Sequence, residues 1–240
     1  MLHKTRGIVL KSTNYSESSV VVQIFTEKFG IQSYLINGVK KPKAKIRNSI
    51  LQPLHLLDMV VYHKPEGNLQ RVAEVRQVPL FQHIPYDIVK SSLTLFLNEV
   101  LYKSLKHQQT DEQLFDYIFH SVELLDKIEG SLNTFHLHFL LKLTRYLGFY
   151  PDLTNSNFNY FDLKEGIYSN VPPPHPYVLD EPYKTYWEIL VKGNIENLGK
   201  ITIPVTERRV LLERLLDYYR LHIDGFDEIK SHHILEEVLN

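Results

Sequence analysis

SVVVQIFTEKFGIQSYLINGV, residues 19–39, contains two runs rich in β-branched and aromatic residues with a short polar turn between them. The first run, Ser19–Thr26, ends at the turn Glu27–Gly30, and the second covers Ile31–Val39. Runs of this length and composition, joined by a turn that contains glycine, are typical of consecutive β-strands. The stretch therefore predicts two strands early in the chain.

Three more short strands are expected on either side of this pair. One covers Ile8–Lys11, and two follow later, over Pro53–Tyr62 and Leu69–Val78. Pro65–Asn68, between the last two, has the composition of a turn. Five short strands within about 80 residues are typical of a small barrel rather than a parallel α/β unit. We therefore predict a five-stranded oligonucleotide-binding (OB) barrel over residues 1–82.

From Pro85 onward the hydrophobic period changes from two to about 3.6, which indicates amphipathic helices. Helices are expected over Tyr86–Lys106, from Thr110 as N-cap to Gly130, from Ser131 as N-cap to Gly148, over Glu181–Lys192, near Asn194–Gly199, from Thr206 as N-cap through Leu221, and over Ile229–Leu239. A long irregular insert at about 150–180, with a hairpin across Tyr160–Tyr168, separates the first three helices from the rest. The expected fold class is α+β, with the barrel followed by an α-helical bundle domain over residues 83–240.

Length and composition bound the class of protein. The 240 residues are 43% hydrophobic and 23% charged, which leaves ample material for a core. No stretch approaches the ~18 consecutive apolar residues of a membrane span, and the N-terminal MLHKTRGIVL lacks the apolar segment of a secretory signal. The chain has no cysteine, which excludes disulfides, thiolate zinc sites and cysteine nucleophiles. We therefore expect a cytoplasmic protein.

The net charge of −1 conceals two parts of opposite sign. Residues 1–82 hold 12 Lys and Arg against 5 Asp and Glu, and the remainder is correspondingly acidic. The densest positive stretch is Gly38–Arg47, GVKKPKAKIR, in which Pro42 disfavours a regular helix or central strand. Its five cations are Lys40, Lys41, Lys43, Lys45 and Arg47. Such a loop suits a phosphate backbone, since each contact releases a counterion, although a solvated loop that only keeps the domain soluble has the same composition.

Aromatic residues of the barrel region offer a second kind of nucleic-acid contact. OB barrels bind single strands by combining a positive groove with aromatics that stack on bases. The candidates are Tyr15, Phe25, Phe29, Tyr34 and Tyr62. In so small a domain we expect most of them to belong to the core.

Sequence signatures of catalysis are absent. There is no GxxxxGK(S/T) phosphate loop, no GxGxxG after a strand, no GxSxG elbow and no HExxH zinc motif. His136 and His138 lie two apart on an expected helix, and His232 and His233 are adjacent, so neither pair shares a helix face that chelates one ion. We expect surface or capping roles for these histidines. An active site assembled in three dimensions between barrel and bundle stays open as an alternative.

Several motifs, taken in order, resemble the RecO family of bacterial recombination mediators. They are RGIVLKSTNYSESS with the following FTEKFG, then NGVKKPKAKIRNSILQPLHLLD, the helix end YLGFYP at Tyr146–Pro151, and IKSHHIL near the C-terminus. The likeness covers most of the chain and is strongest over residues 6–62. Each motif is loose by itself, but their ordered combination is fairly specific.

The resemblance implies an OB barrel, a helical domain and a non-catalytic activity. Members of this family bind single- and double-stranded DNA, anneal complementary strands, and act with RecR to load RecA onto DNA coated by single-strand-binding protein. The resemblance places the DNA contacts at Arg6, Lys11 and the five loop cations Lys40, Lys41, Lys43, Lys45 and Arg47. It also implies a location in the bacterial cytoplasm, at the nucleoid.

The helical domain would then bind the acidic, hydrophobic C-terminal tail of single-strand-binding protein. On this resemblance the tail lies near the third helix, where Lys142 and Arg145 are the basic residues and are expected to contact its carboxylates. Ordinary exposed helix cations have the same sequence pattern, so both interpretations stay open for these two residues.

One departure from the family pattern concerns metal. Many members carry a four-cysteine zinc module after the third helix, whereas here Asp152–Asn170 has no cysteine and His175 cannot replace four thiolates. We therefore expect no cofactor and no metal, and an insert held by packing of its aromatics. An RNA-binding OB-barrel protein remains the main alternative, which competition between RNA and DNA of one sequence separates.

Overall fold

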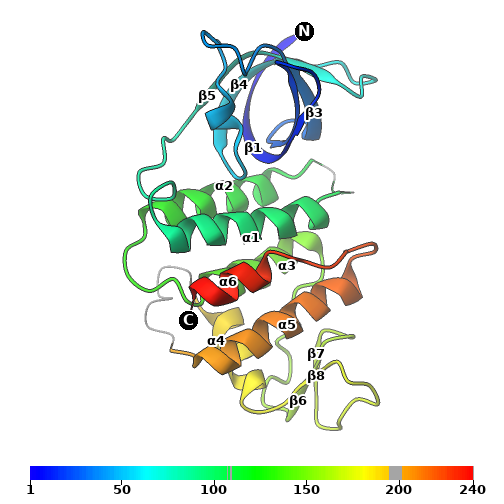
Figure 1. Ribbon diagram of the computed structural model, residues 1–240. Helices are drawn as coiled ribbons and strands as arrows, with labels where there is room; N and C mark the ends of the chain where they lie inside the picture. The colour runs from blue at the N-terminus through cyan, green and yellow to red at the C-terminus, as the bar shows by residue number, and fades with distance from the viewer. Residues whose placement is uncertain (107, 109, 195–201, 240) are drawn as a thin grey trace. The chain divides into compact units, whose positions relative to one another are not determined.

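The computed structural model describes residues 1–106, 108, 110–194 and 202–239 (Figure 1). The chain divides into two compact units, Met1–Ile128 and Glu129–Asn240. Among the described residues, the first unit holds five strands, a short 3-10 helix and two α-helices, and the second holds four α-helices and a small sheet. The domain boundary predicted at residues 82/83 falls in the segment that joins the last barrel strand to the first α-helix, and a division there stays a prediction.

The five strands of the first unit close into a barrel. β1 (Leu2–Asn14), β2 (Val20–Thr26), β3 (Gly30–Ile36), β4 (Leu56–Tyr62) and β5 (Gln70–Gln77) follow the order β1-β2-β3-β5-β4, and β4 pairs back to β1. β3 and β5 are parallel, whereas the other barrel pairs are antiparallel. This is a closed five-stranded barrel of the OB kind. The predicted α+β fold with an N-terminal OB barrel is therefore confirmed.

β1 is much longer than the strand predicted at Ile8–Lys11, because it pairs along both of its halves. Leu2–Ile8 pairs with β4, and Gly7–Asn14 pairs with β2. Because β1 pairs with β2 along one half and with β4 along the other, it joins the two ends of the strand order and closes the barrel.

Alternate strand residues fill the interior of the barrel. Its fully buried side chains include Val9, Val22, Tyr34, Leu57 and Val61. Gly7 lies where β1 approaches this core most closely, because a Cβ there would come within 2.7 Å of Ile24 Cγ2 and Met59 Sδ. Any larger residue would therefore force these two side chains to move.

Two helices complete the first unit. α1 (Ile88–Ser104) begins after Asp87, whose carboxylate accepts hydrogen bonds from two amides of the first turn. α2 (Glu112–Lys127) begins after Asp111, which accepts a hydrogen bond from Leu114 N at 2.9 Å. The prediction of Thr110 as the N-cap of this helix is therefore wrong by one residue, because Asp is a stronger capping residue than Thr and the Asp111 carboxylate accepts from the first-turn amide of Leu114.

The described part of the second unit contains four helices. They are α3 (Phe135–Leu147), α4 (Tyr183–Lys192), α5 (Val205–His222) and α6 (His232–Val238). Gly148 ends α3 with a φ of +89°, which confirms it as the C-terminal glycine of that helix. The helix predicted near Asn194–Gly199 lies, apart from Asn194, outside the described residues.

The N-caps predicted for two of these helices are wrong. Thr134 precedes α3 and Pro204 precedes α5, in place of Ser131 and Thr206, and neither forms a side-chain capping bond. Both predictions rested on residue type alone. Buried apolar residues lie just before both helices, Leu132 before α3 and Ile203 before α5.

The insert at about 150–180 contains a small sheet in the order β7-β6-β8. Its strands are β6 (Tyr160–Asp162), β7 (Ile167–Ser169) and β8 (Val178–Leu179). β6 and β7 pair antiparallel, which confirms the predicted hairpin. Phe161 and Tyr168 face each other across it with ring centres 4.9 Å apart, and both are buried, so aromatic packing holds the insert as expected.

His136 and His138 are buried in α3, which corrects the surface or capping role expected for them. Burial lowers the pKa of His136 to about 3 and that of His138 to about 4, so both rings are neutral at pH 7. His138 Nδ1 lies 3.0 Å from Leu190 O and so connects α3 to α4. The expectation failed because α3 is enclosed on nearly every face, so that polar positions along it are buried as well.

No group of three or more His, Asp or Glu side chains among the described residues is placed to hold a metal ion. His175, the histidine next to the insert, has its Nε2 3.4 Å from Asp162 Oδ1. No helix described is long and apolar enough to cross a membrane.

Candidate nucleic-acid interface

The basic loop, Gly38–Arg47, lies between β3 and the 3-10 helix η1 (Asn48–Leu51). All five of its cationic side chains are exposed: Lys40, Lys41, Lys43, Lys45 and Arg47. Within the described part of the chain, none of the five takes part in an ion pair or a side-chain hydrogen bond. Their charges are therefore available to a ligand.

Apolar residues at both ends fix the basic loop to the barrel. Val39 is buried in the barrel core, and Ile46 packs against the same cluster from the other end of the loop. Short turns shape the backbone between them, one of which is closed by Lys41 N donating to Gly38 O at 3.1 Å. The cations thus extend from a backbone that is held at both ends.

Lys11, the second predicted contact on the barrel, is exposed and lies beside Tyr102 of α1. Its Nζ donates to Tyr102 Oη at 3.2 Å and lies 4.8 Å from the centre of that ring. An ammonium group has three donors, so two stay available for a phosphate. Its contact with DNA stays a prediction.

Arg6 is occupied by contacts inside the first unit. Its Nη2 donates to Glu27 Oε1 at 2.8 Å and to Asp116 Oδ1 at 2.6 Å, and its guanidinium carbon lies 5.1 and 5.0 Å from the ring centres of Phe115 and Phe119. The hydrogen bond to Glu27, more than that to Asp116, raises the pKa of Arg6, and the same bond lowers the pKa of Glu27. Arg6 thus joins β1, the β2–β3 turn and α2, while its contact with DNA stays a prediction.

An open groove of about 780 Å³ lies on the outer face of the barrel. We call it the barrel groove and define it by Lys4, Lys28, Lys45, Asp58, Glu74 and Arg76. Strand register builds its floor, because Lys4, Val60 and Glu74 are paired in one row across β1, β4 and β5, and Asp58 pairs with Arg76 in a neighbouring row. Directly paired residues share a face of the sheet, so these side chains emerge together.

The five candidate stacking aromatics separate by burial. Phe25 and Tyr34 are fully buried, and Phe29 packs partly buried against the barrel core. Tyr15 and Tyr62 remain exposed, at 64% and 48%. Only these two have the exposed ring faces that base stacking requires.

The two residues predicted to contact a partner's carboxylates differ in their surroundings. Lys142 Nζ donates to the carbonyl oxygen of Val191, in the last turn of α4, at 2.6 Å and lies 3.5 Å from Tyr150 Oη. Burial, and to a lesser extent the charge of Arg145, lowers the pKa of Lys142. Lys142 thus stabilises the C-terminal end of α4, whereas Arg145 presents an exposed guanidinium on α3.

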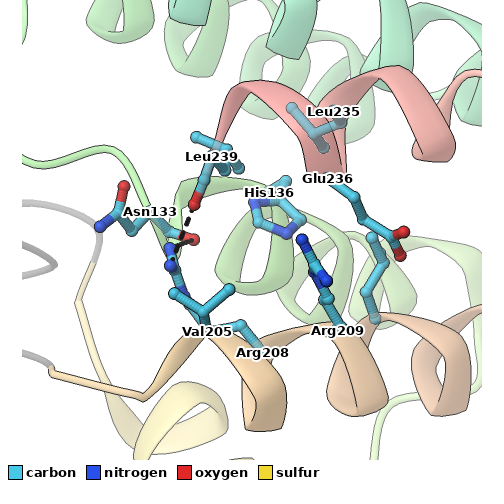
Figure 2. Close-up of a pocket in the computed structure, with 9 residues that line it drawn as sticks. Asn133, His136, Val205, Arg208, Arg209, Leu235, Glu236 and Leu239 are labelled. Atoms are coloured by element: carbon cyan, nitrogen blue, oxygen red, sulfur yellow. Dashed lines mark hydrogen bonds between the residues drawn. The ribbon is translucent and has the colours of Figure 1, made fainter.

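A small pocket in the second unit lies between α5 and α6 (Figure 2). Its volume of about 20 Å³ is roughly that of one water molecule. Arg208 reaches into this region, where its Nη2 donates to Leu239 O at 3.0 Å and its Nη1 to Asn133 O at 3.3 Å (Figure 2). Arg208 therefore ties the end of α6 to the segment just before α3.

Sequence reasoning missed Lys4 and Lys28 as candidate contacts. Both are isolated cations that belong to no charge run, one in β1 and one in the β2–β3 turn. Strand alternation is the signal that would have found Lys4, since it places Lys4 and Arg6 on one face. That signal was lost because the first half of β1 was not predicted as a strand.

A closed OB barrel with an exposed cationic loop, followed along the chain by helices, places this chain in the class of proteins that join an OB barrel to a helical domain. Comparison with protein families gives the particular family. The family described as "Recombination protein O N terminal" matches residues 1–81, and the family described as "Recombination protein O C terminal" matches residues 85–232. The chain belongs to the RecO family.

Three curated relatives, each called "DNA repair protein RecO", support this assignment over their full length. The protein of Azobacteroides pseudotrichonymphae is 36% identical over 241 residues, which cover 100% of both chains. Those of Flavobacterium psychrophilum and Phocaeicola vulgatus are 35% and 34% identical over 241 residues, which cover 99% and 100% of both chains respectively. The resemblance inferred from the ordered motifs is therefore confirmed.

Proposed function

We propose that this chain is a mediator of DNA repair and homologous recombination that binds single- and double-stranded DNA through the basic loop, anneals complementary strands, and catalyses no reaction. The observation that carries the proposal is the set of five exposed cations on a loop anchored to an OB barrel. The names of the full-length relatives support the setting of DNA repair.

The loop would hold DNA by charge. Each contact between a Lys or Arg and a phosphate releases a condensed counterion, which gives affinity at low salt and no sequence preference. Two strands neutralised on one cationic surface repel each other less, so complementary bases meet more often. The bases must stay unstacked from the protein to pair, and GVKKPKAKIR suits this because it has no aromatic residue.

The same proposal gives protein partners to the helical part. The chain would act with RecR, and through it assist RecA, on DNA coated by single-strand-binding protein. For the acidic tail of that protein, Arg145 is the better carboxylate contact, because Lys142 would first have to leave the carbonyl of Val191. The place of action would be the bacterial cytoplasm, at the nucleoid.

Annealing of complementary strands coated with single-strand-binding protein tests this proposal. The loop-neutralised variant, with Lys40, Lys41, Lys43, Lys45 and Arg47 all changed to Gln, is expected to lose most of the annealing rate. A control with the exposed Lys127 and Lys164 changed to Gln should keep it. Coating protein without its C-terminal tail, and Arg145→Gln with intact coating protein, should both slow annealing of coated strands only.

Three outcomes would contradict parts of the proposal. Unchanged annealing by the loop-neutralised variant would remove the loop from DNA binding. Equal annealing with and without the tail would remove the tail-binding role. Preference for single-stranded RNA over DNA of the same sequence would indicate an RNA-binding protein instead, because a reader of the 2′-hydroxyl favours RNA.

A further inference from the structure

We propose that the barrel groove binds the phosphate backbone of a nucleic-acid strand that continues from the basic loop, with Lys4 and Lys28 as its phosphate contacts. This inference rests on the proposed function and extends the DNA path beyond the residues named so far. Lys45 is common to the loop and the groove, so the two surfaces are continuous. A strand held by the loop would therefore enter the groove.

The charge balance of the groove favours a polyanion. Of its three acidic groups, Glu27 is paired with Arg6 at 2.8 Å and Asp58 with Arg76 at 3.0 Å. The Asp58–Arg76 pair cancels its own charge, whereas Arg6 is shared between Glu27 and, at 2.6 Å, Asp116 of α2, which does not line the groove. Arg6 is therefore a positioning residue that reduces the repulsion between Glu27 and phosphates.

Three lysines of the groove keep their charge available. Lys4, Lys28 and Lys45 are exposed and, among the residues that the structure describes, form no ion pair and no side-chain hydrogen bond. Lys28 adds only a weak attraction to Glu27, which contributes the smallest part of the lowered pKa of that carboxyl. Against these three cations stands one unpaired carboxylate, Glu74.

The groove suits a backbone rather than bases. The described residues that line it are charged or apolar apart from one threonine, and none is aromatic. Stacking on bases needs aromatic faces, whereas phosphate contact needs only cations. Binding in the groove is therefore independent of sequence. Removal of the groove lysines is expected to weaken binding of oligo-dT and of mixed-sequence strands equally.

A loss-of-charge experiment tests the two lysines in the full chain. Lys4→Gln with Lys28→Gln is compared with the control pair Lys127→Gln and Lys164→Gln, which removes the same charge from exposed positions that do not line the groove. We expect the log–log salt slope for a single-stranded oligonucleotide to flatten by about 1.4, from about 0.7 for each phosphate contact. The control pair should change the slope by much less. Equal slopes for the two double variants would overturn the proposal.

A gain-of-affinity experiment excludes damage to the fold as an explanation. Glu74→Gln removes the unpaired carboxylate of the groove and is expected to tighten binding about two- to five-fold at low salt, in line with the weak energies of exposed charge pairs. Glu129→Gln, exposed and outside the groove, is the matched control. No gain for Glu74→Gln, or an equal gain for both variants, would overturn the proposal.

Failure of this inference is distinguishable from failure of the proposed function. If the loop-neutralised variant flattens the slope while the groove variants do not, DNA stops at the loop and the groove proposal is wrong. If only the groove variants act, the groove holds DNA and the assignment of the loop is wrong. A groove that takes an acidic protein segment instead of a strand would leave the slope of the Lys4→Gln, Lys28→Gln variant unchanged, which also overturns the proposal.

Discussion

Arg6 and Lys45 both line the barrel groove, but Arg6 pairs with carboxylates of the protein whereas the charge of Lys45 is open to a ligand. Arg6 is enclosed by Glu27, Asp116 and two phenylalanine rings, so its guanidinium holds β1, the β2–β3 turn and α2 together. Lys45 is exposed without such partners among the described residues, so its charge is open to a ligand. At the residue scale, a cation is available to a ligand only where no acidic side chain of the protein already pairs with it.

The first prediction concerns Arg6. Arg6→Gln is expected to lower the free energy of unfolding by about 1–2 kcal/mol, because it leaves two carboxylates without their charged donor. Arg76→Gln, which breaks only the exposed pair with Asp58, is the control and should cost less than about 1 kcal/mol. Urea unfolding at pH 7 measures both. Equal losses of unfolding free energy in the two variants would contradict the role of Arg6 in joining β1, the β2–β3 turn and α2.

The Arg6 effect also has a defined pH dependence. Hydrogen bonding to Arg6 lowers the pKa of Glu27 in the folded chain below its ordinary 4.5. A carboxylate with a lowered folded pKa stabilises the fold above its unfolded pKa and loses that contribution as pH falls through the folded value. The difference between wild type and Arg6→Gln should therefore be full above about pH 5 and shrink in more acidic solution.

At the scale of elements, Asp126 near the end of α2 fixes the segment that leads from β5 to α1. Its carboxylate accepts hydrogen bonds from the amides of Gln82, His83 and Ile84 at 2.8 to 2.9 Å. These bonds outweigh burial and lower the pKa of Asp126. The buried Lys90 of α1 donates to the Asp126 carbonyl at 2.7 Å, so the two helices and the connecting segment form one hydrogen-bonded junction.

The second prediction concerns this junction. Asp126→Ala leaves three amides without their acceptor and is expected to cost about 2–3 kcal/mol of unfolding free energy. Asp126→Asn keeps one oxygen and should cost less. Amide hydrogen exchange measures the effect locally, with loss of protection at residues 82–84 in Asp126→Ala and a smaller loss in Asp126→Asn. Unchanged exchange at these amides would contradict the account of the junction.

At the scale of the whole molecule, the second unit depends on neutral buried histidines. His138 has its pKa lowered to about 4 by burial, whereas an unfolded histidine titrates near 6.5. A group with a lowered folded pKa that must stay neutral stabilises the fold fully above the unfolded pKa. Its contribution is lost as pH falls from about 6.5 toward about 4.

The third prediction follows from this titration. Between pH 7 and pH 4.5 the second unit is expected to lose about 2–3 kcal/mol through His138 alone, at about 1.4 kcal/mol for each pH unit below 6.5. His138→Gln should remove that part of the dependence, while His136 retains its own. Trp187, the single tryptophan and buried in α4, reports unfolding of this unit by fluorescence. An identical pH dependence in the variant would contradict the assignment.

The fold could be predicted where the decisive pattern is local. Runs such as Ser19–Thr26 indicated strands, and Gly148 indicated a helix end, because one short window contains the whole signal. The first half of β1 was missed because Thr5 and Gly7 occupy its inward positions in place of large apolar residues. Thr5 is buried, and Gly7 has room for nothing larger, so tertiary packing removed the alternation.

The candidate site, too, could be predicted only where its residues are neighbours in sequence. The five cations of the basic loop are neighbours in sequence, so a charge count finds them. The barrel groove needs the register of three strands, and the pairing of Arg6 with Asp116 joins residues 110 positions apart. No sequence window contains such partners, which is why the internal role of Arg6 was not expected.

The salt dependence of single-stranded DNA binding tests the central claim, that the basic loop holds DNA by its phosphates. The affinity of the wild type and of the loop-neutralised variant is measured for one oligonucleotide across a range of salt concentrations. If all five cations contact phosphates, the log–log slope of the variant flattens by about 3.5, at about 0.7 for each contact, while its unfolding free energy stays that of the wild type. An unchanged slope in a folded variant would contradict the claim.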